Sequence, residues 1–172
     1  MFLLTELTSW QRGFDSNKRV HKRDIWNATY RLFLINPNRI VDLKVDGNGS
    51  MFLFSDNHRD RRENLSFVKS NSTVAEVITA HDLAFHSNFI TLNFYPKNNP
   101  TKTTVATTVA VEDIAYFDDY NDPDYPNCVW MVYCRKGFRR VEQLVEGTLE
   151  NTYDRLLTGT TSTTTTTSDR EQ

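Results

Sequence analysis

The stretches STVAEVI, residues 72–78, and TLENTYDRLL, residues 148–157, decide how the rest of this chain is read. Each places mostly apolar residues on one face of a short helix, because the spacing follows the helical period of 3.6 residues. These faces are formed by Val74, Val77, Ile78 and His81 in the first helix and by Leu149, Tyr153, Leu156 and Leu157 in the second. The same element therefore occurs twice in the chain.

The ends of both helices carry the residues that helix ends favour. Thr73 and Thr148 each precede a helix and can cap its N-terminus, and Glu76 lies at the position that completes a capping box with Thr73. Gly159 is well placed to end the second helix, because glycine adopts the left-handed conformation found there. We expect His81 to lie at the inner edge of the first helix.

Segments that precede the two helices are typical of β-strands, with alternating apolar residues and turn residues between them. DGNG, residues 46–49, predicts a hairpin turn, since Gly47 and Gly49 both tolerate positive φ. Before the first helix the strand segments are MFLLTEL (1–7), TYRLFLINPNRIVDLKV (29–45), MFLFS (51–55) and LSFVK (65–69). Before the second they are FITLNFYP (89–96), TTVATTVAVEDIAYF (103–117), CVWMVYC (128–134) and FRRVEQLV (138–145).

These patterns predict a mainly β protein made of two tandem β-meander repeats, each closed by a short helix. INPNRIVDL (35–43) and VAVEDIAYF (109–117) correspond as strand, polar corner and strand. We place the repeats at residues 1–84 and 85–159, as two small barrels or one joint sandwich. Each is small for an independent fold, which favours mutual packing about a pseudo-two-fold axis. The alternative is that any all-β chain shows comparable regularity.

Each half loosely resembles small β-rich proteins of the flagellar FlbD type. The resemblance lies in the -IN- corner after the second strand segment and in FVKSNSTVAEVI (67–78), matched more distantly by LVEGTLENTYDRL (144–156). It implies a fold and carries no active site with it.

Composition excludes several functional classes. The chain has 172 residues with a formal net charge of -2, so no overall field draws it to nucleic acid or to a membrane. Glu6 interrupts the apolar start after a few residues, which argues against a signal peptide, and no apolar run is long enough to span a bilayer. Cys128 and Cys134 lie about 20 Å apart along one extended segment, too far for a disulfide. A reducing cytoplasm is expected.

Neither a metal, a cofactor nor an active site is predicted. The four histidines show no zinc-like pairing with the cysteines. The acidic segment DDYNDPDYP (118–126) lacks the glycine and glutamate of a calcium loop, and we interpret it as a proline-stiffened loop. Nucleophile elbows, phosphate-binding glycine loops and zinc-protease helices do not occur in the sequence.

Three basic clusters leave nucleic-acid binding open as an alternative function. They are KRVHKR (18–23), HRDRR (58–62) and RKGFRR (135–140), and acidic residues lie close to all three. Small β-barrels do bind nucleic acid with arginines and stacked aromatics. We favour instead a role for Arg135, Arg139 and Arg140 in contacts between subunits, where complementary charge improves register.

The first repeat carries an insertion, residues 9–28, that the second lacks. Its composition is polar and basic, yet it contains Trp10, Phe14 and Trp26. Aromatic residues and arginines among polar ones are typical of interface hot spots. We expect this arm to contact a partner, the alternative being that its tryptophans cover an end of their own sheet.

The chain ends in a threonine-rich tail, residues 160–172. Threonine is β-branched and prefers extended backbone, but the tail has too little apolar surface to order itself. We expect it to pair with the sheet edge of a neighbour through Thr163, Thr164, Thr165, Thr166 and Thr167.

In general character the chain resembles accessory virion proteins of tailed bacteriophages, such as neck-ring, head-completion or capsid-decoration proteins. Small repeated β domains, free cysteines and extended arms carry this resemblance. It implies a non-enzymatic structural protein, assembled into a virion in the host cytoplasm, with copies of itself and other virion proteins as partners. The alternatives are a nucleic-acid-binding small barrel and a hydrolase with a site between the two repeats.

Overall fold

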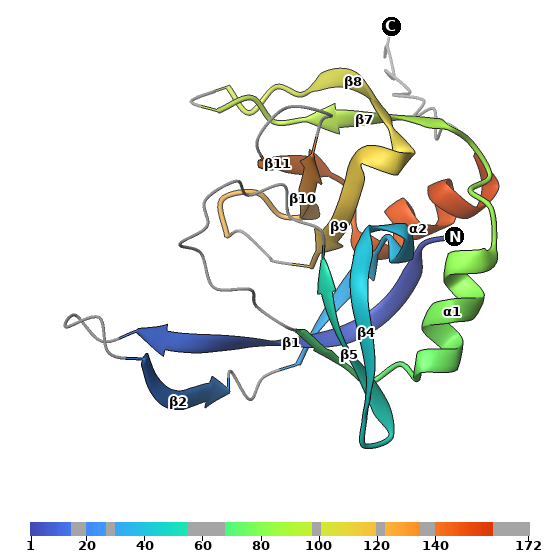
Figure 1. The fold of residues 1–172 in the computed structure, drawn as a ribbon. Helices are drawn as coiled ribbons and strands as arrows, with labels where there is room; N and C mark the ends of the chain where they lie inside the picture. Colours follow the sequence, from blue (N-terminus) through green and yellow to red (C-terminus); the bar gives the residue numbers. More distant parts are fainter. Residues whose placement is uncertain are drawn as a thin grey trace, which may run out of the picture.

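A computed structural model of the protein describes residues 1–14, 20–26, 30–54, 68–97, 101–119, 123–134 and 140–159. For residues 9–14, 20–26, 134 and 140 it describes the backbone. The protein is mainly β, as the sequence predicts, and two short α-helices accompany the strands within this part of the chain (Figure 1).

The strands of the first half of the chain are β1 (Leu3–Phe14), β2 (Val20–Trp26), β3 (Arg31–Ile35), β4 (Ile40–Asp46), β5 (Gly49–Phe54) and β6 (Val68–Ser70), followed by helix α1 (Val74–Asp82). Those of the second half are β7 (Phe89–Phe94), β8 (Val105–Ala110), β9 (Ile114–Asp118), β10 (Cys128–Cys134) and β11 (Arg140–Glu146), followed by helix α2 (Leu149–Thr158). Short 3-10 turns, η1 (Pro37–Arg39) and η2 (Val111–Asp113), connect β3 to β4 and β8 to β9.

All described strands join in one antiparallel sheet with the order β4-β5-β6-β1-β3-β9-β10-β11-β7-β8, and β2 pairs with β1 beside this path. The first five strands of that order and the last five are arranged alike, since each set begins with the strand that follows the 3-10 turn. The two sets meet where β3 pairs with β9. The division into two domains at residue 84, and the choice between barrels and a sandwich, stay predictions.

The β4–β5 hairpin shows that its two glycines have different roles. Gly47 has φ of 57° and supplies the left-handed conformation expected of the turn. Gly49 does not have positive φ, and the prediction was wrong for this residue. A Cβ atom on Gly49 would lie 2.1 Å from the carbonyl oxygen of Ser70, so glycine is required because two backbones approach closely.

Helix α1 begins with the predicted capping box. Thr73 Oγ1 accepts a hydrogen bond from the Glu76 N–H at 3.2 Å, and the Thr73 N–H donates to Glu76 Oε2 at 2.7 Å. Thr148 caps α2 in the same way through the Asn151 N–H. Gly159 ends α2 with φ of 65°, and its N–H donates to the Arg155 carbonyl oxygen.

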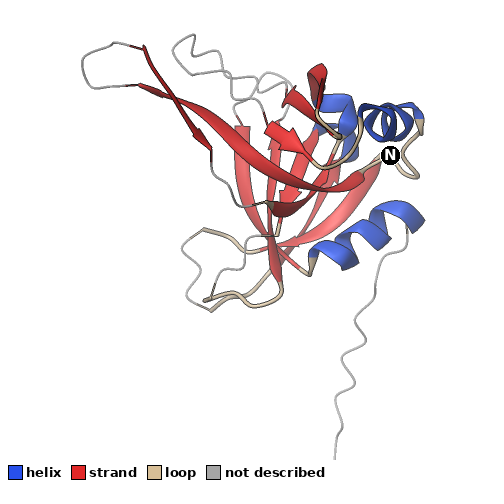
Figure 2. Ribbon diagram, turned by 90° about the horizontal axis from the view of Figure 1, so that it is seen from below, coloured by secondary structure: helices blue, strands red, loops and turns tan. Residues whose placement is uncertain are grey.

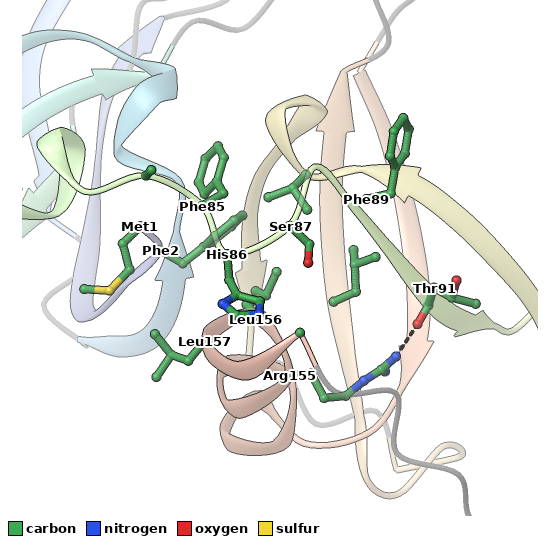
Figure 3. A pocket seen from close by; sticks show the side chains of 14 residues that line it. Met1, Phe2, Phe85, His86, Ser87, Phe89, Thr91, Arg155, Leu156 and Leu157 are labelled. Carbon is green, nitrogen blue, oxygen red and sulfur yellow. Dashed lines mark hydrogen bonds between the residues drawn. The ribbon is translucent and has the colours of Figure 1, made fainter.

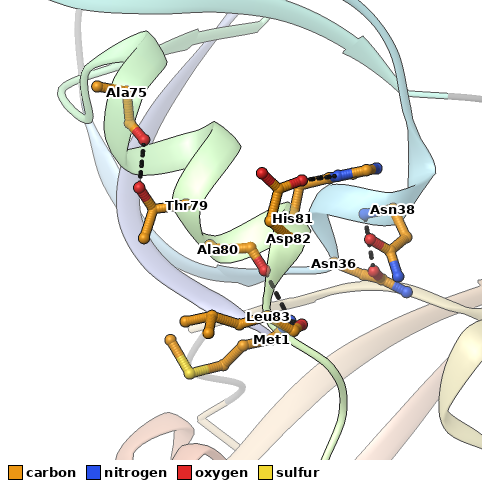
Figure 4. Close-up of polar contacts among 9 residues, drawn as sticks. All are labelled: Met1, Asn36, Asn38, Ala75, Thr79, Ala80, His81, Asp82 and Leu83. Carbon is orange, nitrogen blue, oxygen red and sulfur yellow. Dashed lines mark hydrogen bonds and ion pairs between the residues drawn. The ribbon is translucent and has the colours of Figure 1, made fainter.

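The buried face of α1 differs from the predicted one. Val77 and Ala80 are buried, whereas the side chains of Ile78 and His81 are exposed. His81 therefore does not lie at the inner edge of the helix. Its Nδ1 lies 3.1 Å from Asp82 Oδ1 at the exposed end of α1 (Figure 4). Helix α1 contacts both η1 and β4.

Among the described residues the hydrophobic core forms two clusters, and each takes residues from both halves of the chain. The larger cluster contains Phe2 and Leu34 of the first half together with residues of the second, among them Phe117 and Met131. The smaller cluster is built on Leu7, Ile35 and Phe52, and Tyr116 of β9 packs against it. Both clusters meet at the β3–β9 junction, so this junction lies at the centre of the molecule.

Residues 9–14 and 20–26 of the expected insertion form strand rather than loop. The sequence predicted a strand that ends near Leu7, but β1 continues to Phe14 and pairs with β2 in an antiparallel ribbon. Backbone hydrogen bonds between the two strands explain the difference, because they do not require the apolar alternation that marks a half-buried strand.

Candidate subunit interface

The β1–β2 ribbon projects from the body of the protein. Figures 1 and 2 show it extending away from the sheet and from both helices. Within the described part of the chain, β2 pairs with β1 alone. The backbone register places Trp10 opposite Trp26 and Phe14 opposite Val20, so the three predicted aromatic residues occur on this one ribbon.

The other residues predicted to contact partners fall largely outside the described residues. Arg135, Arg139 and the threonines Thr163, Thr164, Thr165, Thr166 and Thr167 all lie there. Arg140 begins β11, where its backbone pairs with that of Cys134. Of the partner-binding residues inferred from sequence, the structure brings together those of the arm.

Two strands at the ends of the sheet form a feature that the sequence did not reveal. Among the described strands, β4 and β8 each pair on one side only, with β5 and with β7. Apolar side chains are exposed at both: Val41 and Val45 on β4 are 61% and 75% exposed, and Val105 on β8 is 54% exposed. Unpaired edges of this kind are templates for a further strand.

A shallow groove of about 210 Å³ lies beside the free edge of β4, between this strand and α1. Its lining is mainly apolar and comes from Pro37, Ile40, Val41, Leu43, Val77 and Ile78, with Asp42 and His81 as the polar members. Ile78 of α1 is 47% exposed at this groove.

A second cavity, of about 300 Å³, is formed by the N-terminal residues, the segment that links the two halves, β7 and α2 (Figure 3). Arg155 reaches from α2 to the carbonyl oxygen of Thr91, and its Nε is buried without a hydrogen-bond partner in the described part of the chain. Burial lowers the pKa of this guanidinium. The same lining contains His86 and Ser87 but no carboxylate from the described residues.

This cavity therefore offers a cation and apolar contacts. A serine–histidine nucleophile needs a third group to orient the histidine, and the described lining supplies no carboxylate for that purpose.

Close to the same cavity, the amino group of Met1 donates a hydrogen bond of 2.7 Å to the Ala80 carbonyl oxygen and another to that of Leu83 (Figure 4). Burial lowers the pKa of this amino group. These contacts fix the start of β1 to the end of α1.

Asp118 and Cys128, two further residues of the chemical candidates from sequence, lie in the described part of the chain. No group of three His, Cys, Asp or Glu residues that could hold a metal ion occurs in the described part of the chain. Asp118, the first residue of the acidic segment, makes an ion pair of 2.7 Å with Arg31. The Cys128 thiol is buried, and it donates to the Tyr125 carbonyl oxygen at 2.6 Å. None of the described helices is long and apolar enough to cross a membrane.

No protein family, no curated protein and no solved structure matches this chain.

Proposed function

We propose that the protein is a non-enzymatic structural subunit of a large assembly, which joins neighbouring subunits through its arm and its sheet edges. The observation that carries this proposal is the projecting β1–β2 ribbon. An isolated two-stranded ribbon is only marginally stable in water, so a ribbon of this length gains stability from a surface that covers one face.

The composition of the ribbon supports a protein surface as its partner. Trp10 and Trp26 occupy opposed positions, and tryptophan is enriched among the residues that contribute most to binding. Basic residues of the same arm suit the polar rim that surrounds such anchors.

The tail and the basic segment at residues 135–140 belong to the same proposal. The threonine-rich residues 160–172 provide extended backbone for strand addition, and the arginines provide charge that aligns one subunit on the next. The kind of assembly that fits is a virion of the tailed-bacteriophage type, built in the host cytoplasm, to whose accessory proteins the chain is similar in character.

Sedimentation velocity over a concentration series tests this proposal. We expect the full chain to associate, and the variant Trp10→Ser/Trp26→Ser to need a concentration on the order of tenfold higher, because two interface anchors are lost. Tyr30→Ser is a matched control, since Tyr30 is an aromatic residue 48% exposed outside the ribbon. Far-ultraviolet circular dichroism establishes that each variant is folded. A full chain that remains monomeric at every concentration, up to the solubility limit, contradicts the proposal.

A further inference from the structure

The two halves of the sheet contain corresponding parts at corresponding places. In each half a strand leads through a 3-10 turn into the next strand: β3, η1 and β4 in the first, and β8, η2 and β9 in the second. In each half the strand after the turn pairs with the following strand, as β4 with β5 and β9 with β10. In each half a capped helix ends the unit.

An irregularity in the pairing makes the correspondence specific to single residues. The register of β4 on β5 shifts between Ile40 and Asp42, which leaves Val41 without an opposite residue. The register of β9 on β10 shifts between Ile114 and Tyr116, which leaves Ala115 in the same situation. Val41 and Ala115 occupy the same place relative to their 3-10 turns. Such bulges bend a strand in a defined direction.

The environments of these two bulged residues differ completely. Ala115 is 1% exposed because β3 pairs with the outer edge of β9, and the Asn36 N–H donates to the Ala115 carbonyl oxygen at 2.8 Å. Val41 is 61% exposed, because no described strand pairs with the outer edge of β4. The β3–β9 junction is formed within the molecule, whereas the corresponding outer edge of β4 has no partner among the described strands.

The helices show the same difference. Tyr153 and Leu156 of α2 pack against the core cluster that contains Leu34 of β3. Their counterparts on α1 are Ile78 and His81, counted from the capping threonines, and both are exposed beside the groove. The apolar side of α1 thus lacks the strand that α2 has.

The strand that corresponds to β3 is β8, and no described strand pairs with its outer edge either. Ile35 and its counterpart Val109 are both buried, whereas Leu34 is buried and its counterpart Thr108 is exposed. Leu34 reaches across the junction into the cluster that holds the helix α2 residues. The Thr108 hydroxyl forms a hydrogen bond of 2.8 Å with the hydroxyl of Thr91 on β7.

We propose that β8 of one copy pairs antiparallel with the free edge of β4 in a second copy, beside α1. This interaction would repeat between two molecules the β3–β9 pairing that one molecule makes internally. The inference rests on the proposed function and deepens it, because it names the partner and the surface.

The internal junction also fixes the register that we expect. In that junction Phe33 is opposite Asp118, Leu34 is opposite Phe117 and Ile35 is opposite Tyr116. We replace each residue of this junction by its counterpart in the other half, counted from the 3-10 turns. The register then places Thr107 opposite Lys44, Thr108 opposite Leu43, and Val109 opposite Asp42.

Backbone groups of β8 have the orientation that this pairing needs. The Val111 N–H donates to the Asn88 carbonyl oxygen, on the side of β7. Because alternate residues of a strand direct their backbone groups to opposite sides, Thr108 and Ala110 direct theirs outward. The same alternation occurs in β3, where the Asn36 N–H and the Leu32 carbonyl oxygen bond to the β9 side.

The side chains of β8 are small enough for the groove. Ala106 and Thr108 occupy the positions at which β3 has the larger residues Leu32 and Leu34. The groove between β4 and α1 has a volume of only about 210 Å³, which suits small side chains. No residue of β8 carries a charge, so the strand brings no charge that must be desolvated.

The pairing is head-to-tail, because it joins two different surfaces of the same chain. Each bound copy leaves one β4 edge and one β8 edge open at the ends of the assembly. Contacts of this kind generate a closed ring where the rotation closes and a filament where it does not.

Cysteine cross-linking tests the register directly. Thr107 and Lys44 would form a non-hydrogen-bonded pair, whose Cα atoms lie about 4.5 Å apart, within the reach of a disulfide. We expect a mixture of Lys44→Cys and Thr107→Cys chains to give a covalent dimer on mild oxidation, and each variant alone, or the wild-type chain, to give none. A chain that carries both substitutions should give a ladder of higher species.

Val105→Cys mixed with Lys44→Cys is the matched control. Val105 lies on the same strand as Thr107 but two residues away. Its Cα would lie about 7–8 Å diagonally from that of Lys44, where a disulfide forms poorly. Equal cross-linking in this mixture, or dimers from either single variant of the tested pair, would overturn the inferred register and direction.

A proline substitution supplies a second, independent test. Thr108→Pro removes an N–H group that is directed away from β7, so β8 is retained while the outer edge loses a donor. We expect it to weaken association at least about tenfold by sedimentation, while Thr108→Val, which keeps the N–H, does not. If Thr108→Pro does not fold, the cross-linking experiment still decides.

The outcomes separate this inference from the proposed function. Association without cross-linking at the expected pair overturns the β8–β4 pairing and leaves the structural role intact. A chain that neither associates nor cross-links overturns both.

Discussion

Among single residues, Asp118 carries the clearest electrostatic cost. Its Oδ2 is paired with Arg31 at 2.7 Å, but its Oδ1 is buried without a hydrogen-bond partner in the described part of the chain. Burial raises the pKa of this carboxyl above its usual value, Arg31 opposes the change in pKa, and Asp119 adds to it. Desolvation of the charged form is the larger effect.

The direction of this shift in pKa predicts a pH dependence of stability. Because the folded pKa of Asp118 lies above the unfolded one, its favourable contribution is fully present below the unfolded pKa, near 3.8. This contribution is lost as the pH rises through the folded pKa. Asp118→Asn removes the titration, so its unfolding free energy relative to wild type should increase between pH 3 and pH 7. Urea unfolding at both pH values measures the difference, and a decrease would contradict the expectation.

Sequence alone indicates the role of a residue where that role is local. The capping residues Thr73 and Thr148 and the positive φ of Gly47 and Gly159 follow from neighbours within a few positions. The requirement for Gly49 does not, because it arises from the carbonyl of Ser70 on another strand.

The secondary-structure elements lead to a prediction about helix α1. Thr73→Ala removes the side chain that accepts the Glu76 N–H, and we expect a loss of about 0.5–2 kcal/mol in the free energy of unfolding. Thr79→Ala is the control on the same helix, since Thr79 is exposed and its hydroxyl donates to the Ala75 carbonyl oxygen within the helix. It should change stability by less than about 0.5 kcal/mol. Urea denaturation compares the two variants, and equal losses would be evidence against the cap.

Elements with strong apolar alternation or a capped helical face were predicted from sequence, and the β1–β2 ribbon was predicted only as an arm. SWQRGF, residues 9–14, contains polar residues and Gly13, so nothing in it indicates a strand. Pairing with residues 20–26 supplies the hydrogen bonds that make it one. The residues that pair in this hairpin are separated in sequence, so the pairing leaves no local pattern. For this reason the composition identified the arm but not its conformation.

For the whole molecule, the distribution of the core predicts cooperative unfolding. Because Phe2 and Leu34 belong to the same cluster as Phe117 and Met131, neither half buries its core without the other. We expect a single transition by calorimetry and by urea, coincident between circular dichroism and fluorescence. Leu34→Ala should destabilise the whole molecule by about 2–5 kcal/mol. Two separate unfolding transitions, of which the substitution affects only one, would contradict the prediction of cooperative unfolding.

At this scale the sequence could establish the class of fold but not the arrangement of the two halves. The strand segments of both halves have similar patterns, so their composition does not say which edges meet. The β3–β9 pairing depends on contacts between residues about 80 positions apart, such as the ion pair of Arg31 with Asp118. The open edges of β4 and β8 follow from that pairing and became visible only with it.

The sequence of β8, VATTVA, has a practical consequence for anyone who produces this protein. Soluble β proteins usually guard an exposed strand with lysine or proline, and this strand has neither. No residue of the strand hinders its pairing with the backbone of another molecule. The extent of non-specific pairing should therefore depend on the protein concentration and on how soon β8 binds its proper partner edge. Overproduction of the isolated chain should therefore give insoluble material, and a lysine on the solvent side of β8 should restore solubility.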